Sequence, residues 1–303
     1  MRHIAFLAAI AALLAGCSTP SGTDGDLTNG WAAQPAPSEP VPAAGSCLTA
    51  SGKVVYGDEG DPVTTEVDCA TPHKLEVVKT GRFPDDISPP GWGSKAMQSA
   101  YADCGKAASE YTGADWHTGW LFVHIGRPST AAWAGGARTY VCGLVEGEST
   151  NAYTPAVERT GSLKGALAAG TSPVVRRCAK RTGVETDAQG FYKRAGAQRR
   201  IDCAAPHDAE FAGAIGLPPG PYPSWAAQQD YVLPRCVEAV AGLFGLSEPA
   251  LRRRGDVKVE FTHLDDETEW LAGEHVSICY AVVASTHPVR GSLKGIGTGP
   301  LPV

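Results

Sequence analysis

The nine-residue pattern D-C-A-x-P-H-x-x-E occurs twice in this chain, beginning at Asp68 and again at Asp202. A longer block recurs with it, because residues 104–113 align without gaps on residues 236–245, from Cys to Gly in both copies. The matched blocks keep the same order in the two halves, which indicates an internal repeat. The sequence therefore predicts a tandem duplication in which each half folds into the same small unit.

Tryptophan and glycine recur at matching offsets near the end of each half. Trp133 and Gly136 in the first half correspond to Trp270 and Gly273 in the second, and the pentapeptide GSLKG follows in both. Because the two tryptophans match between the halves, core packing is the role that we favour for them.

The repeat and the local composition divide the chain into a series of segments. A run rich in Ala, Gly and Ser separates the two repeats. The predicted segments are a lipoprotein signal peptide (1–16), a tether (17–45), repeat 1 (46–165), a linker (166–173), repeat 2 (174–297) and a tail (298–303).

The N-terminus has the form of an export signal. Arg2 precedes an apolar run at residues 4–13, which is shorter than the roughly 20 residues that a membrane-spanning helix needs. The run ends in the tetrapeptide LAGC at residues 14–17, which resembles a bacterial lipobox. Cleavage before Cys17 would make it the lipidated first residue of the mature protein.

Residues 18–45 are rich in Pro, Gly, Ser and Ala and contain neither Lys nor Arg. Such a segment cannot bury enough apolar surface to offset the entropy lost on ordering. We expect a disordered tether with a root-mean-square span of about 30 Å, which would hold the repeats off the membrane.

Nine cysteines are present, so eight remain once Cys17 is set aside as the lipid site. An even number in an exported chain indicates disulfides. Four cysteines in a repeat allow three connectivities. The pairing that we favour links two early strands, and the main helix to the last strand, in each repeat: Cys47–Cys69, Cys104–Cys142, Cys178–Cys203 and Cys236–Cys279.

Hydrophobic periodicity predicts an α+β fold for each repeat, with a mostly antiparallel sheet and one main helix. The expected strands are residues 53–56, 64–68, 75–80, 120–125 and 139–145 in repeat 1, and 257–264 and 276–283 among those of repeat 2. The first helix is expected to begin at Ser94 and to turn Cys104 toward the core. The second is expected over residues 225–244, broken or kinked by Pro234.

The arrangement resembles the septum-formation domain family of actinobacterial exported proteins. The resemblance rests on the two DCxxPHxxE strings, on the stretch PSTAAWAGGARTYVC (128–142) and on GSLKG at 161–165 and 291–295. It covers about residues 45–165 and 174–297, and repeat 1 fits better than repeat 2. The resemblance implies a role in septation and no defined reaction.

Each half contains two histidines and one glutamate at matching places. These residues are His73, His124 and Glu76 in repeat 1, and His207, His263 and Glu210 in repeat 2. Histidine and carboxylate are ligands that zinc uses, so one hypothesis is a metal site in each repeat. The interpretation that we favour is structural, with the histidine ring bonded to loop backbone and no cofactor beyond the lipid on Cys17.

Motifs for nucleophilic hydrolysis are missing from the sequence. It has no GxSxG elbow and no HExxH, and GSLKG is one residue short of SxxK. The even cysteine count leaves no free thiol for a Cys–His transpeptidase. We therefore expect a protein without catalytic activity and keep a cell-wall hydrolase as the third hypothesis.

Two groups of residues are candidates for a binding surface. The start of repeat 2 is basic and includes Arg176, Arg177, Arg199 and Arg200, which would suit an anionic lipid, a wall polymer or an acidic partner. The alternative is a solvated strand pair whose arginine stems cover apolar surface. Trp92 and Trp225 lie beside loops rich in Pro and Gly and are the second group.

These features together predict an envelope lipoprotein that acts as a binding or scaffold module, in septum formation or wall assembly. We expect it at the outer face of the cytoplasmic membrane, anchored through its lipid and facing the wall. The expected partner is an envelope or divisome protein or an anionic wall polymer. The net charge of −6 argues against nucleic acid. The main alternative is a metal-binding envelope protein that uses the recurring histidines.

Overall fold

The computed structural model describes residues 41–50, 64–150, 155–264 and 267–303. The signal peptide, Cys17, most of the tether and the strand expected at 53–56 lie outside this part of the chain. The elements of repeat 1 are β1 (Cys47–Ala50), β2 (Thr64–Val67), β3 (Leu75–Arg82), α2 (Lys95–Thr112), η2 (Trp116–Thr118), β4 (Leu121–Gly126), α3 (Thr130–Ala134) and β5 (Thr139–Glu146).

The second repeat has a matching set of elements. They are β6 (Cys178–Thr186), β7 (Tyr192–Arg200), β8 (Ala209–Gly216), α4 (Trp225–Phe244), α5 (Glu248–Arg252), β9 (Lys258–Phe261), α6 (Glu267–Ala272) and β10 (Val276–Val282). No described helix combines the length and the apolar character that crossing a membrane requires.

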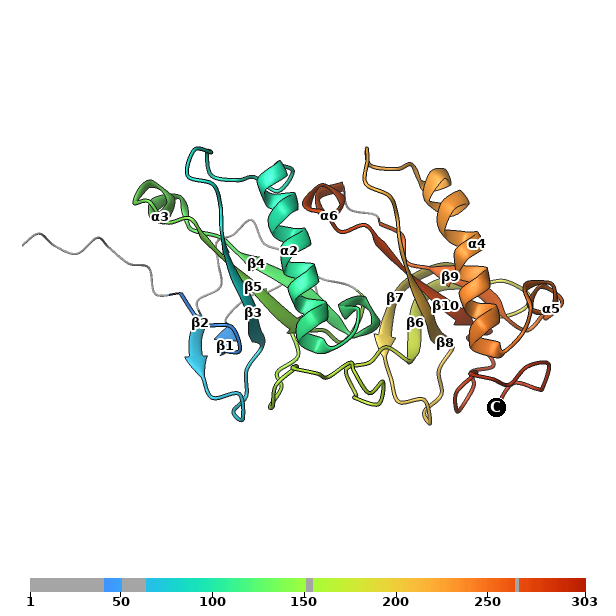
Figure 1. The fold of residues 1–303 in the computed structure, drawn as a ribbon. Coiled ribbons are helices and arrows are strands. Elements are labelled where there is room, and N and C mark those ends of the chain that lie inside the picture. The colour runs from blue at the N-terminus through green and yellow to red at the C-terminus, as the bar shows by residue number, and fades with distance from the viewer. Residues whose placement is uncertain (1–40, 51–63, 151–154, 265–266) are drawn as a thin grey trace, which may run out of the picture. The chain divides into compact units, whose positions relative to one another are not determined.

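Each repeat forms an antiparallel sheet of five strands with a long helix against it (Figure 1). The strand orders, β2-β1-β3-β5-β4 and β7-β6-β8-β10-β9, are the same when the repeats are aligned. Both sheets also have a register shift at the same place, at Val78 of β3 and at Ala212 of β8. The predicted α+β class is confirmed, and the shared bulge extends the sequence repeat to the backbone.

Local sequence sets the ends of the main helices. The side chain of Ser94 accepts a hydrogen bond from the Met97 amide, and Gly113, at φ 86°, ends α2 in the left-handed conformation. Helix α4 likewise ends at Gly245. Helix α4 runs through Pro234 without a break, so of the two effects expected at this residue the break is wrong and the kink stays a prediction.

The two faces of each sheet bury different clusters. In repeat 1, α2 packs on β3, β4 and β5 around Met97, Cys104 and Leu144, while Leu75 and Val77 line the opposite face. In repeat 2 the face opposite α4 is completed by Trp120, which comes from repeat 1. The repeats therefore share part of their core.

Candidate functional site

The D-C-A-x-P-H pattern forms a tight turn in both repeats. In repeat 1 the carboxylate of Asp68 accepts a hydrogen bond from the Ala70 amide at 2.8 Å, and its carbonyl accepts from the Thr71 amide. In repeat 2 the Asp202 carboxylate accepts from the Ala204 amide at the same distance, 2.8 Å. Each aspartate therefore closes its turn, as Asp does in Asx turns.

The histidine of the pattern is buried and fixed by backbone. His73 is 1% exposed, and its Nδ1 lies 2.8 Å from the Thr71 carbonyl oxygen. Nδ1 of His207 lies 2.9 Å from the Ala205 carbonyl in the same way. A carbonyl oxygen only accepts, so Nδ1 carries the proton in both rings. The Nε2 atoms of both rings are buried and have no hydrogen-bond partner among the described residues.

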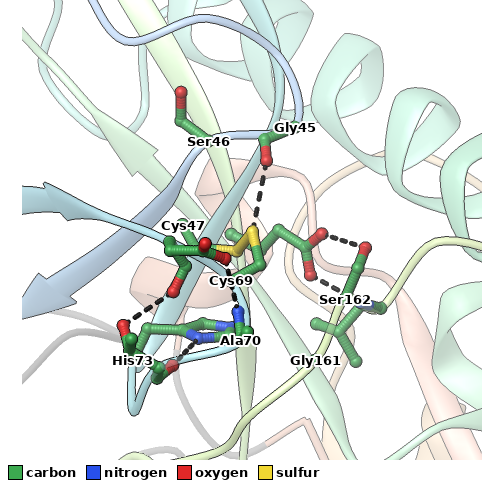
Figure 2. Close-up of a disulfide and its surroundings, with 12 residues drawn as sticks. Gly45, Ser46, Cys47, Cys69, Ala70, His73, Gly161 and Ser162 are labelled. Carbon is green, nitrogen blue, oxygen red and sulfur yellow. Dashed lines mark hydrogen bonds between the residues drawn. A yellow bond between two sulfur atoms is a disulfide. The ribbon is translucent and has the colours of Figure 1, made fainter.

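The glutamate of the pattern binds the GSLKG loop. Glu76 lies at the start of β3, and its carboxylate accepts hydrogen bonds from the Ser162 hydroxyl and, at 2.6 Å, from the Leu163 amide (Figure 2). The Tyr111 hydroxyl on α2 donates to the same carboxylate at 2.5 Å. Burial and this bond to Glu76 raise the pKa of Tyr111 to about 12, so the phenol keeps its proton at neutral pH.

The second glutamate makes the same connection in repeat 2. Glu210 accepts from the Ser292 hydroxyl and from the Leu293 amide, each at 2.5 Å. The loop then returns to the end of α4, where the Gly295 amide donates to the Leu243 carbonyl. The two recurring motifs of each repeat are therefore one structural unit, in which a buried carboxylate holds the loop that follows the last strand.

The disulfide at the start of each repeat lies beside this unit. Figure 2 shows the one in repeat 1, between Cys47 and Cys69. In repeat 1 a ligand atom of Cys47, of His73 and of Glu76 lie within 4.8 Å of one another, and all three residues are buried. Cys178, His207 and Glu210 form the matching group in repeat 2. The structure forms the four disulfides in the connectivity that we favoured: Cys47–Cys69, Cys104–Cys142, Cys178–Cys203 and Cys236–Cys279.

His124 does not join His73 and Glu76. Along the paired strands His124 is opposite Gly143, which is opposite Val77. Glu76 is opposite Leu144, which packs under α2. Neighbours across a sheet point to the same face and successive residues to opposite faces, so His124 lies on the face away from Glu76.

His263 is likewise separate from the group of repeat 2. It lies just after β9, and its ring stacks on Trp225 with ring centroids 5.0 Å apart. Trp225 begins α4, whereas Glu210 binds the loop beside the C-terminal end of that helix. The hypothesis of a site built from two histidines and a glutamate therefore requires correction in both repeats.

Arg176 is a core residue. It is buried, its guanidinium donates to the His117 carbonyl at 3.1 Å, and it lies 4.5 Å from the centre of the Trp120 ring. A side chain held in this way joins the two repeats and is not part of an exposed basic surface.

The remaining arginines proposed for the basic surface differ in their partners. Arg199 pairs with Glu148 at 2.6 Å, and Arg200 pairs with Glu146. Arg177 is exposed and donates to two carbonyl groups of the linker. Carboxylates of repeat 1 therefore neutralise part of the positive charge that we predicted for the start of repeat 2.

The tryptophans divide into buried and exposed groups. Trp133 and Trp270 are buried, in line with a packing role. Trp225 is 57% exposed, and Trp92 is half-buried under the guanidinium of Arg127 at 4.9 Å. Trp225 is therefore the more accessible of the two aromatic candidates.

Repeat 2 contains a buried ionic cluster that the sequence did not predict. The fully buried side chain of Arg181 lies 2.6 Å from Glu260, 3.4 Å from Asp208 and 2.9 Å from the Val283 carbonyl. Burial raises the pKa of Asp208, and Arg181 only partly offsets this effect. Arg181 is the fourth residue of β6, and the sequence carries no signal for its burial, because arginine is usually exposed.

A second missed cluster connects the repeats through His117 of η2. Its Nδ1 lies 2.6 Å from Asp115, its Nε2 lies 3.4 Å from Glu274, and the Tyr101 hydroxyl donates to Glu274 at 2.5 Å. Burial opposes the charge on His117, but the two carboxylates outweigh it and raise its pKa to about 9. Burial also acts against the charge on Glu274, yet the bonds from His117 and Tyr101 hold its pKa below the ordinary value.

Comparison with known proteins finds one family whose model matches this chain. The family model described as septum formation matches residues 38–279 in one span that runs across both repeats. The resemblance seen in the sequence is therefore confirmed, although the match is continuous and does not fall into one match for each repeat. No curated protein and no solved structure matches the chain significantly. Since the family model covers most of the chain, this protein belongs to the septum formation family.

Proposed function

We propose that this protein is a membrane-anchored envelope lipoprotein that acts without catalysis, as a binding or scaffold module in septum formation or wall assembly. The observation that carries the proposal is the use of the recurring motif residues within the fold. Glu76 and Glu210 accept hydrogen bonds from the GSLKG loops of their own repeats, and a disulfide lies beside each. The residues that recur in both repeats thus stabilise the two folds. We call the hydrogen bonds between the buried glutamate and its GSLKG loop the brace of each repeat.

The anchoring part of the proposal rests on the sequence. The LAGC tetrapeptide at residues 14–17 would place a diacylglyceryl group on Cys17, and the tether would carry the repeats toward the wall. The disulfides suit the oxidising side of the membrane. The protein would then reside at the outer face of the cytoplasmic membrane.

A protein partner suits the described surface better than an anionic polymer. Arg199 and Arg200 are paired with carboxylates, and Arg176 is buried, so of these four arginines only Arg177 is exposed without a carboxylate partner among the described residues. Trp225 at the start of α4 is large and exposed, and such side chains often anchor protein interfaces. We propose the α4 end of repeat 2 as the contact with a septal or envelope protein.

Localisation and crosslinking in cells test the proposal. The tagged full chain should concentrate at septa, and Cys17→Ser should move it from the membrane to the soluble fraction. Trp225→Ala should reduce capture of the crosslinked partner, whereas Lys106→Ala, on the exposed side of α2, should not. Uniform distribution with unchanged septa after deletion would contradict the septal part. Retention of Cys17→Ser in the membrane would contradict the anchor, and wall-degrading activity in a zymogram would contradict the non-catalytic role.

A further inference from the structure

The brace explains the glutamates but leaves the histidine rings of the motif without a role. Nε2 of His73 and of His207 are buried and have no hydrogen-bond partner among the described residues, and each of these residues is only 1% exposed. A buried polar atom without a partner destabilises the folded state. This destabilisation occurs at the same motif position in both repeats, which points to a use for this nitrogen.

The groups around each ring are metal-ligand types. In repeat 1 a ligand atom of His73, the sulfur of Cys47 and a carboxylate oxygen of Glu76 lie within 4.8 Å of one another. Cys69 is bonded to Cys47, so its sulfur lies directly beside that of Cys47. Two thiolates, one imidazole and one carboxylate would make a four-ligand set that suits Zn²⁺. The disulfide withholds the two sulfurs from this set.

The nitrogen and oxygen ligands are already oriented for such a site. Nδ1–H of His73 donates to the Thr71 carbonyl, which directs the Nε2 lone pair away from the loop. Glu76 is fixed by the Leu163 amide and by Tyr111. Histidine and carboxylate ligands of metals in proteins are usually held by outer hydrogen bonds of this kind.

Each disulfide also has an accessible side. Cys69 is half-buried whereas Cys47 is fully buried, so Cys69 is the more accessible residue of the first bond. In repeat 2 the Cys178–Cys203 bond lines a cavity of about 530 Å³, together with Arg177. A small reductant therefore has a route to the S–S bond from outside.

We propose that reduction of these two disulfides opens one Zn²⁺ site in each repeat. A dithiol reductant transfers two electrons and two protons, so it becomes a disulfide and the protein gains two thiols. Zn²⁺ then displaces both thiol protons and binds two thiolates, Nε2 and the carboxylate. The ligands are Cys47, Cys69, His73 and Glu76 in repeat 1, and Cys178, Cys203, His207 and Glu210 in repeat 2.

The proposal predicts a stoichiometry that ordinary thiol binding does not. Within the part of the chain that the structure describes, only these two disulfides have a histidine and a glutamate in reach. The Cys104–Cys142 and Cys236–Cys279 bonds lack them, so a fully reduced chain should bind two ions. The two sites should also differ, because Arg159 lies 3.8 Å from Glu76 and would offset the net negative charge of the first site.

The purified full chain, reduced with a phosphine and kept without oxygen, provides the test. Native mass spectrometry with Zn²⁺ should show two bound ions after reduction and none before. His73→Ala and His207→Ala should each weaken one site by about tenfold or more, and the double variant should weaken both. His124→Ala is the matched control, because this histidine lies on the other face of the sheet, and it should retain two ions.

Circular dichroism shows whether the reduced chain is still folded. If the reduced chain unfolds, adding Zn²⁺ should restore the native spectrum of the wild type but not of the double variant, since metal binding is then coupled to folding. Reduced wild type that binds no Zn²⁺, or that stays unfolded with Zn²⁺ present, would overturn the proposal. Two ions bound with unchanged affinity in the double variant would also overturn it.

Discussion

The two repeats share a backbone plan but fill it with different chemistry. Both have the same strand order, the same bulge and the same bond from a buried glutamate to a GSLKG loop. On the face away from the main helix, repeat 1 buries Ala50 among aliphatic side chains. The matching position in repeat 2 is Arg181, which is paired with Asp208 and Glu260. The fold thus accommodates either an apolar or an ionic group of buried side chains at this position, whereas both repeats retain the bond from the glutamate to the GSLKG loop.

Replacement of Arg181 should give the largest loss of stability. Arg181→Met would leave Asp208 and Glu260 without their buried counter-charge, and we expect the free energy of unfolding to fall by about 3–5 kcal/mol. Denaturant unfolding measures the loss, with exposed Lys180→Met as a control that should change it by less than about 0.5 kcal/mol. The loss should shrink at acidic pH, because Asp208 then takes up a proton.

The same position offers a converse experiment. Replacing Arg181, Asp208 and Glu260 together by leucine would give repeat 2 an apolar filling like that of repeat 1. Stability should return to within about 1–2 kcal/mol of the wild type, because exchange of a buried ionic cluster for packed apolar groups is often neutral. A triple variant as unstable as Arg181→Met would show that the two fillings are not interchangeable.

A second difference concerns the segment after the main helix, which is η2 in repeat 1 and α5 in repeat 2. His117 lies in η2, whereas α5 contains no histidine. The pKa of His117 is raised to about 9 from an ordinary value of 6.5. The stabilisation from this group is complete below about pH 6.5 and is lost as the pH rises through 9. Its size is on the order of 3 kcal/mol.

The pH dependence of unfolding tests this link. His117→Asn should remove the fall in stability between pH 6.5 and pH 9 and leave a flatter profile. His287→Asn is the control, because this histidine is exposed near the end of repeat 2. An unchanged slope in His117→Asn would mean that the contact with Glu274 does not contribute to the stability of the pair of repeats.

The braces themselves should differ in strength. Glu76 accepts from Tyr111, Ser162 and Leu163, whereas Glu210 accepts only from the two groups of its GSLKG loop among the contacts described. Glutamine cannot accept from all of these donors, so Glu76→Gln should cost about 3 kcal/mol and Glu210→Gln about 2 kcal/mol. Denaturant unfolding, with exposed Glu110→Gln as the control, measures both. Equal losses would contradict the ranking.

The sequence predicts the repeated parts of this molecule well and the unrepeated parts poorly. Duplicated cysteines, Ser94 as a helix cap and strand periodicity lead to the correct fold class, because these signals are local or occur twice. The role of the glutamates needed a contact with GSLKG, more than 80 residues away. The signal that could have revealed it is the recurrence of GSLKG at a similar distance after the glutamate in both repeats.

The errors have a related cause. His124 shares the chemistry of a ligand, but strand register places it on the wrong face, and register depends on pairing with β5. Arg181 and His117 occur in one repeat only, so the comparison of the two halves gave no indication of their burial. A residue type that is usually exposed is recognised as a core group only when its partners are known.

Removal of one hydroxyl isolates the extra donor of repeat 1 and gives the smallest expected effect. In the alignment of the two helices, Tyr111 corresponds to Leu243, so Tyr111→Phe makes the first brace chemically similar to the second. We expect a loss of about 1 kcal/mol, because the carboxylate keeps its bonds to Ser162 and Leu163. Combining the change with Glu76→Gln forms a double-mutant cycle, in which the two losses should add to more than the double variant shows. Strict additivity would mean that the hydroxyl stabilises α2 independently of the glutamate, and the difference between the braces would then need another source.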